Sequence, residues 1–422
     1  MKIFHKIKAQ AMQFALLVSV IIAILLSAFL LLTHVQSFFK IKSQELITAV
    51  ELANHQLLVS LQTPVISEDT IQNSVDSKTT KLIATYHGIW TKTVSDVITN
   101  NRKIRKVAFS GTAIGLKTPN VYIADKNAPL VIVGDTRLEG NSYVPTQGIK
   151  AGNISGNYYQ GSSLYYGNVY QSKETIPPLD NKWISYIESF TNGVFIDEEL
   201  MVPLEKEIKN SFDNQPMLLY DPTPIFLGNE NITGNIIIQS ASKIVVSSAA
   251  TLTDVILIAP EIVVQNNFKG SIQAIATKKI TIGERCLLSY PSSVTLFDKN
   301  VIPTGQNNSQ NNRNSDFIIH KNTEIEGAVL YIRPKGELQN RIKSHMKIDD
   351  HVLITGEIYC NGNIEFSGTV KGSLYTQQFV TKASGSIYLN HVYNGKILKN
   401  PIVKYAGIPF KDTKKTVAKW LY

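Results

Sequence analysis

A repeat at fixed spacing constrains the fold of this chain more than any other feature. Three segments read KIVV, EIVV and KITI, and their first isoleucines, Ile244, Ile262 and Ile280, are 18 residues apart. Apolar residues also recur every six positions across this region: Phe226, Ile232, Ile238, Ile244, Ala250, Ile256, Ile262, Phe268, Ala274, Ile280 and Cys286. Successive coils that stack their equivalent inward positions into apolar columns require this pattern.

The repeat predicts a mainly β fold with a parallel β-helix over residues 220–400. Further along, four glycines each precede a short β-rich run that ends in tyrosine: Gly327, Gly356, Gly372 and Gly385. A sandwich or an ordinary barrel would also use short strands. The constant 18-residue step favours the β-helix over both.

Composition divides the rest of the body into segments. Residues 105–180 are rich in β-forming residues, and we expect them to be the first part of the same solenoid. Residues 181–215 are predicted to be a helical insert, because apolar residues from Trp183 to Phe190 share one helical face. Residues 63–104 are expected to be a partly helical linker, and residues 401–422 a basic C-terminal tail. The polar run 306–315 predicts a loop.

The N-terminus carries a candidate membrane anchor. No charged residue lies between Lys8 and Lys40, and Phe14–Leu32 contains only two residues, both serines, that are not apolar. A helix of about 19 residues crosses the roughly 30 Å hydrocarbon core of a bilayer. The run exceeds the usual length of a signal-peptide core, so we expect an uncleaved anchor in contact with lipid.

The helix is expected to continue beyond the bilayer. No glycine precedes Gly88 and no proline precedes Pro64, which predicts one helix from near Gln10 to Gln62. Residues 1–62 are therefore assigned to a membrane anchor and helical stalk. The apolar stripe of the stalk comprises Leu46, Val50, Ala53, Leu57 and Leu61. The stalk would hold the body away from the membrane, or would pack beside copies of itself or a partner.

Charge near the anchor predicts its orientation. Three lysines at positions 2, 6 and 8 precede the apolar run, and positive residues favour the cytoplasmic side. We expect a single-pass protein of a bacterial inner membrane, with a cytoplasmic N-terminus and a periplasmic or extracellular body. The net charge of +9 is spread along the chain, so no nucleic-acid partner is expected.

The residues give little sign of catalysis. His345, Asp349, Asp350 and His351 lie close in sequence, as metal ligands often do. In a strand, His345, Asp349 and His351 would share one face but spread over about 20 Å, so we expect a solvated loop. The alternative is a carbohydrate site in which Asp349 and Asp350 act with Arg341. We therefore assign no catalytic, cofactor-binding or metal-binding residue, and the protein is expected not to be an enzyme.

Two cysteines and a group of tyrosines leave alternatives open. Cys286 is one of the apolar residues that recur every six positions, which are expected to point inward, so it is expected to be a buried free thiol. A disulfide with Cys360 is also compatible with an exported body. The tyrosines are predicted to stack in columns along the solenoid, and a carbohydrate-binding or adhesive surface is the second interpretation. They are Tyr158, Tyr159, Tyr165, Tyr166 and Tyr170.

Two families share parts of these patterns. The coil pattern of the body resembles bactofilins, the polymer-forming β-helix proteins, over roughly 170 residues. That resemblance implies a structural or assembly role in the cell envelope with self-association. The basic leader and long apolar helix resemble type IV pilins and pseudopilins, with Ala11-Met12 at the cleavage position but Leu16 where that family has an acidic residue. The alternatives are a pilus-like minor subunit and a polysaccharide-acting β-helix enzyme.

Overall fold

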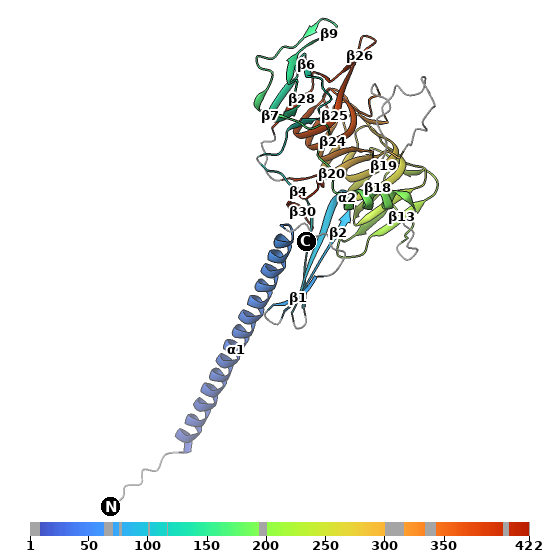
Figure 1. Cartoon of the computed structure of the whole chain (residues 1–422). Coiled ribbons are helices and arrows are strands. Elements are labelled where there is room, and N and C mark those ends of the chain that lie inside the picture. Colours follow the sequence, from blue (N-terminus) through green and yellow to red (C-terminus); the bar gives the residue numbers. More distant parts are fainter. Residues whose placement is uncertain are drawn as a thin grey trace, which may run out of the picture. The chain divides into compact units, whose positions relative to one another are not determined.

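The computed structural model describes a mainly β protein with one long N-terminal helix (Figure 1). It covers residues 9–62, 71–75, 78–99, 102–115, 117–193, 201–299, 316–333, 343–399 and 405–421. The chain divides into two compact units, one of residues 1–58, 70–82 and 95–106, the other of residues 59–69, 83–94 and 107–422. Strands β2 (Lys78–His87), β3 (Trp90–Thr99) and β4 (Arg102–Ala113) each run from one unit into the other.

The first unit contains all but the last two residues of helix α1 (Ala9–Ser60), which confirms the prediction of one long helix. Its span Ala11–Ser60 is long and apolar enough to cross a membrane, with a mean hydropathy of 3.1 in its most apolar 18-residue window. A signal sequence would meet the same criterion. Apolar side chains from Met12 to Leu32 are exposed in the folded chain, which is typical of a helix surface that contacts lipid.

The C-terminal part of α1 is not a bare stalk. Ala49 and Ala53 are buried and form an apolar cluster with Val97 of β3. Polar contacts reinforce this packing, since Lys78 Nζ donates to Thr48 Oγ1 at 2.8 Å. The helix therefore packs on strands of its own unit and does not end as an isolated rod.

The expectation of a partly helical linker over residues 63–104 is wrong for the described residues. They form β1 (Ile71–Val75), all of β2 and β3 and the start of β4, and β1 pairs with β2 in antiparallel register. The segments are rich in threonine and valine, whose branched side chains favour strands. That composition explains why these residues form strands and not a partly helical linker.

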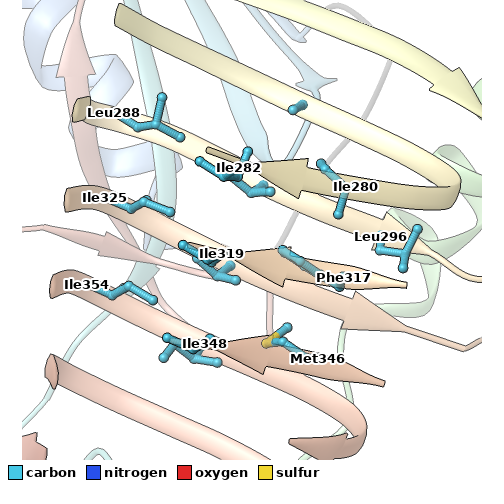
Figure 2. Packing of buried hydrophobic residues seen from close by; sticks show 14 of the residues in the cluster. Ile280, Ile282, Leu288, Leu296, Phe317, Ile319, Ile325, Met346, Ile348 and Ile354 are labelled. Atoms are coloured by element: carbon cyan, nitrogen blue, oxygen red, sulfur yellow. The ribbon is translucent and has the colours of Figure 1, made fainter. Parts of the chain in front are cut away.

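The second unit is built on a closed sheet that is mostly parallel. Ile244 pairs with Ile262 and Ile262 with Ile280, so the 18-residue step is the register of the sheet. In Figure 2 the side chains of Ile282, Ile319 and Ile348 lie in successive strands and fill the interior. The strands in chain order are β12 (Glu207–Asn210), β13 (Met217–Asp221), β14 (Ile225–Leu227), β15 (Asn231–Gly234), β16 (Ile236–Ser240), β17 (Lys243–Val246), β18 (Thr251–Val264), β19 (Lys269–Ile282), β20 (Leu287–Phe297), β21 (Phe317–Ile319), β22 (Glu324–Ile332), β23 (Met346–Ile348), β24 (Leu353–Phe366) and β25 (Thr369–Ala383).

The prediction that the apolar residues recurring every six positions point into the closed sheet is correct at most positions and wrong at two. Phe226 is 67% exposed, because its neighbours Ile225 and Leu227 take the inward positions of β14. Ile256 is buried on the outer face of the sheet, in a different cluster from Ile244. Asp254 has a φ of 59° where the register shifts, and this irregularity exchanges the two faces of the strand.

The segment 105–180 is divided between sheets: residues up to Ala113 lie in β4, whereas residues 121–123, 137–144 and 166–171 belong to the closed sheet and stack beyond its last long strand, β25. Strand β5 (Val121–Ile123) pairs with β25, and β7 (Arg137–Val144) pairs with both β5 and β28 (Lys396–Leu398). Strand β11 (Tyr166–Gln171) then pairs with β7. Chain order and stacking order therefore differ, which a search for sequence periods does not detect. Four short strands lie nearby: β6 (Leu130–Val133), β8 (Ile149–Ala151), β9 (Asn153–Ile154) and β10 (Asn157–Tyr158).

The predicted helical insert is shorter than residues 181–215. Helix α2 (Asn181–Asn192) begins as expected, with the Asp180 side chain accepting from Lys182 N, and buries Trp183 and Phe190. Residues 194–200 lie outside the described part of the chain. Residues 207–210 form strand β12, whose alternating side chains favour a strand over a helix.

The predicted basic tail is part of the fold. Strands β29 (Ala406–Gly407) and β30 (Lys415–Trp420) pair with β4 in antiparallel register. Ile408 is fully buried in the cluster that covers the outer face of the closed sheet, together with Trp90 and Phe109. Strands β26 (Ser386–Leu389) and β27 (His391–Tyr393) complete the C-terminal region, with Gly385 at the hairpin before β26.

Candidate functional site

The acidic and histidine-rich segment does not form a joint site. His345 is buried, and its Nδ1 accepts from Asn363 N at 3.0 Å. Burial, with the nearby Lys343 and Arg333 cations, lowers the pKa of His345 to about 4. The side chain of His351 is exposed at a turn with a φ of 57°. The two histidines therefore lie in different environments.

The carboxylate of Asp349 is occupied by neighbours. It contacts Lys347 Nζ at 2.9 Å and His320 Nδ1 at 3.1 Å. Arg341, its partner in the carbohydrate hypothesis, lies outside the described residues. Among the residues that the structure describes, no group of three or more histidine, cysteine or acidic side chains is arranged to hold a metal ion.

The two cysteines are free and buried, which confirms the free-thiol prediction for Cys286. Its Sγ donates to Gln265 O at 3.1 Å. Burial raises the pKa of Cys286, and burial raises that of Cys360 as well. Neither thiol has the lowered pKa that reactive cysteines require.

Tyrosine side chains form a column across the closed sheet. Tyr359, Tyr375, Tyr122, Tyr143 and Tyr170 are register partners in successive strands. The ring centroids of Tyr143 and Tyr170 are 4.9 Å apart, and those of Tyr122 and Tyr143 are 5.5 Å apart. These distances suit offset stacking. A tyrosine column therefore exists, but the prediction that the five tyrosines named from the sequence stack in columns holds for Tyr170 alone.

The column ends on strand β11, which has an open edge. All six residues of β11 are exposed, and Tyr170 at the end of the column is 44% exposed. Among the described residues, β11 has register partners on β7 and none on β12, although the order of the closed sheet places β12 beside it. An edge strand presents a row of backbone N–H and C=O groups to another strand.

The residues of β11 do not protect this edge. Edge strands are usually shielded by lysine, other charged residues or proline. The sequence of β11, YGNVYQ, contains none of them. The guanidinium of Arg137, on the neighbouring strand β7, lies over the Tyr166 ring at 4.3 Å. Strand β11 can therefore accept another uncharged strand without charge repulsion.

The opposite end of the closed sheet is better shielded. Strand β12 carries the exposed ion pair Lys209–Glu207, at 2.7 Å. Met201 forms a parallel bridge with Leu218 of β13, and Val202 N donates to Leu218 O at 2.9 Å. The two ends of the sheet thus differ, and β11 is the candidate interaction site.

Sequence reasoning found the tyrosine content near this site but missed the site itself. The register that brings Tyr122 next to Tyr375 joins residues about 250 positions apart, and no local pattern encodes it. One signal was present, namely a β-rich hexapeptide without charge or proline. Comparison with protein-family models, with curated proteins and with solved structures finds no match.

Proposed function

We propose that this protein is a membrane-anchored, non-enzymatic structural or assembly component of the bacterial cell envelope. In this proposal its closed sheet is a β-helix that associates with a second copy through β11. The observation that carries the proposal is the exposed, uncharged and proline-free edge of β11. Edges of this kind pair readily with another chain.

The anchor part of the proposal rests on α1. Its Phe14–Leu32 segment contacts the lipid bilayer as a single-pass helix. The lysines at positions 2, 6 and 8 keep the N-terminus in the cytoplasm. The helix is then an inner-membrane anchor, and the body lies in the periplasm or outside the cell.

A dimer fits the two ends of the sheet better than an open filament. Polymerisation of the bactofilin kind would join one end of each molecule to the opposite end of the next. The bridge of Met201 to Leu218 and the charges of β12 disfavour that contact. A pairing of β11 with β11 uses one surface on both copies and closes after two.

Sedimentation velocity of the full chain in detergent tests the proposal. The wild-type protein should pass from monomer to dimer as its concentration rises, after correction for bound detergent. Asn168→Lys places a charge at the centre of the exposed β11 and should keep the protein monomeric, because two copies would oppose like charges. Tyr158→Lys, at a residue that is 68% exposed outside the closed sheet, is the matched control and should still dimerise. A wild-type monomer at every concentration would refute the association.

One observation favours the pilus-like subunit as a second candidate. Helix α1 is continuous over 52 residues, with an exposed apolar N-terminal part, and such helices can pack against copies of themselves. This function requires cleavage between Ala11 and Met12. Intact-mass spectrometry of protein purified from membranes would show the cleaved N-terminus if it is correct and the complete one if it is not.

A further inference from the structure

The outer face of the closed sheet contains a pocket with a buried carboxyl group. The pocket has a volume of about 420 Å³ and is lined by Glu357, Tyr375, Phe410 and Pro177, among others. This volume falls within the range of small-molecule sites, and most of the lining surface is apolar. Every lining residue belongs to the second unit.

Register explains why Glu357 reaches the pocket. Its partners on the neighbouring strands are Ala328 of β22 and Ser373 of β25. Both are small, so the longer glutamate side chain has space beside them. The residue is only 2% exposed, and its Oε2 accepts from Ile408 N at 2.6 Å.

Several contacts hold the pocket walls in place. The rings of Tyr375 and Phe410 are 4.9 Å apart at an angle of 63°. Tyr359 Oη donates to Pro177 O at 3.1 Å, and Lys411 N donates to Pro178 O at 3.2 Å. The pocket is thus formed by packed and hydrogen-bonded segments from distant parts of the chain.

The charges around Glu357 leave it without a strong electrostatic partner in the described residues. The titratable groups that face it are the phenols of Tyr290 and Tyr375, and Lys411 and Asp412 line the pocket as exposed residues. Burial raises the pKa of Glu357 to about 7, and the bond from Ile408 offsets this only in part. A buried carboxylate is costly unless a cation or further donors compensate it.

We infer that this pocket binds a small organic molecule that carries one protonated amino group on an aromatic or aliphatic body. The ammonium group would donate to the Glu357 carboxylate and supply the missing charge. The apolar body would contact Tyr375 and Phe410, whose ring faces also attract cations. This site lies apart from β11 and does not depend on dimer formation.

Calorimetric titration of the full chain in detergent tests this inference with two probes of similar shape. The first is 2-phenylethylamine, which is cationic at neutral pH, and the second is the neutral 2-phenylethanol. The amine should bind at one site and at least about tenfold more tightly than the alcohol, because it gains a charge-assisted hydrogen bond. The amine should also lose about tenfold in affinity from pH 8 to pH 6, as the Glu357 carboxylate takes up a proton.

Variants separate the site from general partitioning into detergent. Glu357→Gln keeps an acceptor for Ile408 N but removes the charge, and should reduce amine affinity to that of the alcohol. Glu324→Gln, at an exposed carboxylate on β22, is the matched control and should bind like the wild type. Equal affinity of the wild type for the two probes, or unchanged amine binding by Glu357→Gln, would overturn the inference. The wild-type comparison decides the question even if Glu357→Gln does not fold.

Discussion

Single residues show most directly how the closed sheet constrains its sequence. Gly327, Gly356 and Gly372 are register partners on three adjacent strands, and each has a φ between 139° and 147°. A Cβ added to Gly356 would overlap the carbonyl oxygen of Gly327. These glycines therefore permit close approach of stacked backbones in a conformation that other residues rarely adopt.

Gly356→Ala is expected to destabilise the second unit by about 2 kcal/mol or more, because it adds backbone strain to a steric overlap. Gly228→Ala is the control, since a Cβ there meets no atom within 4 Å, and it should change stability by less than about 0.5 kcal/mol. Chemical denaturation of both variants measures the difference. Equal stability would contradict the assigned register.

Buried histidines predict a loss of stability in acid. The pKa of His345 is lowered to about 4 by burial, so the folded chain excludes a proton that the unfolded chain binds below about pH 6.5. The stabilisation is present above pH 6.5 and is lost as the pH falls towards 4. It amounts to about 2 kcal/mol between pH 7 and pH 5.

His345→Gln keeps an acceptor for Asn363 N and should reduce the pH dependence of the unfolding free energy by that amount. His351→Gln changes an exposed histidine of the same segment and should keep the wild-type dependence. Denaturation at pH 7 and pH 5 compares the three proteins. If the unfolding free energy of His345→Gln fell as much in acid as that of the wild type, the assignment of His345 as a buried, neutral histidine would be wrong.

At the scale of elements, the sequence predicts strands and helices correctly where the pattern of apolar residues repeats over a short stretch of the chain. The 18-residue step gave the pairing of Ile244, Ile262 and Ile280, and an uninterrupted apolar run gave α1. It failed where register or stacking changes, as at Asp254. The positions of β5, β7 and β11 after β25, and the pairing of β30 with β4, depend on contacts between distant segments. The pocket at Glu357 was missed for the same reason.

Helix α1 gives a test of element packing. Ala53 is fully buried between α1 and strands of its own unit, so Ala53→Leu should overpack this contact and cost about 1–3 kcal/mol. His55→Leu adds a leucine to the exposed face of the same helical turn and should have little effect. Hydrogen exchange at residues 95–99 of β3 reads the local stability. Equal protection in the two variants would mean that α1 does not pack there.

At the scale of the whole molecule, the proposed dimer predicts a specific cross-link. If two β11 strands pair in antiparallel orientation about a two-fold axis, a residue near the axis faces its own copy. Asn168 lies near the middle of β11, and Tyr166 and Tyr170 lie two residues to either side. At about 3.3 Å per residue, Tyr166 and Tyr170 are each roughly 13 Å from their own copies along the strands.

A disulfide needs Cα atoms within about 7 Å. Asn168→Cys should therefore form a covalent dimer under mild oxidation, whereas Tyr166→Cys and Tyr170→Cys should cross-link far less. Lys209→Cys, at an exposed residue of β12 at the other end of the sheet, controls for random collision. The native thiols do not interfere, because Cys286 and Cys360 are buried.

The pattern of cross-links distinguishes the possible assemblies. A single maximum along β11, with none at Lys209→Cys, supports the two-fold dimer. Head-to-tail stacking would leave every single variant uncross-linked but would join Tyr170→Cys to a variant of the β12–β14 end. That result would favour an open filament of the bactofilin kind and refute the dimer. Because each assembly pairs a different set of backbone edges, a non-reducing gel of the single variants and of a mixture of Tyr170→Cys with Lys209→Cys decides which end of the sheet is used.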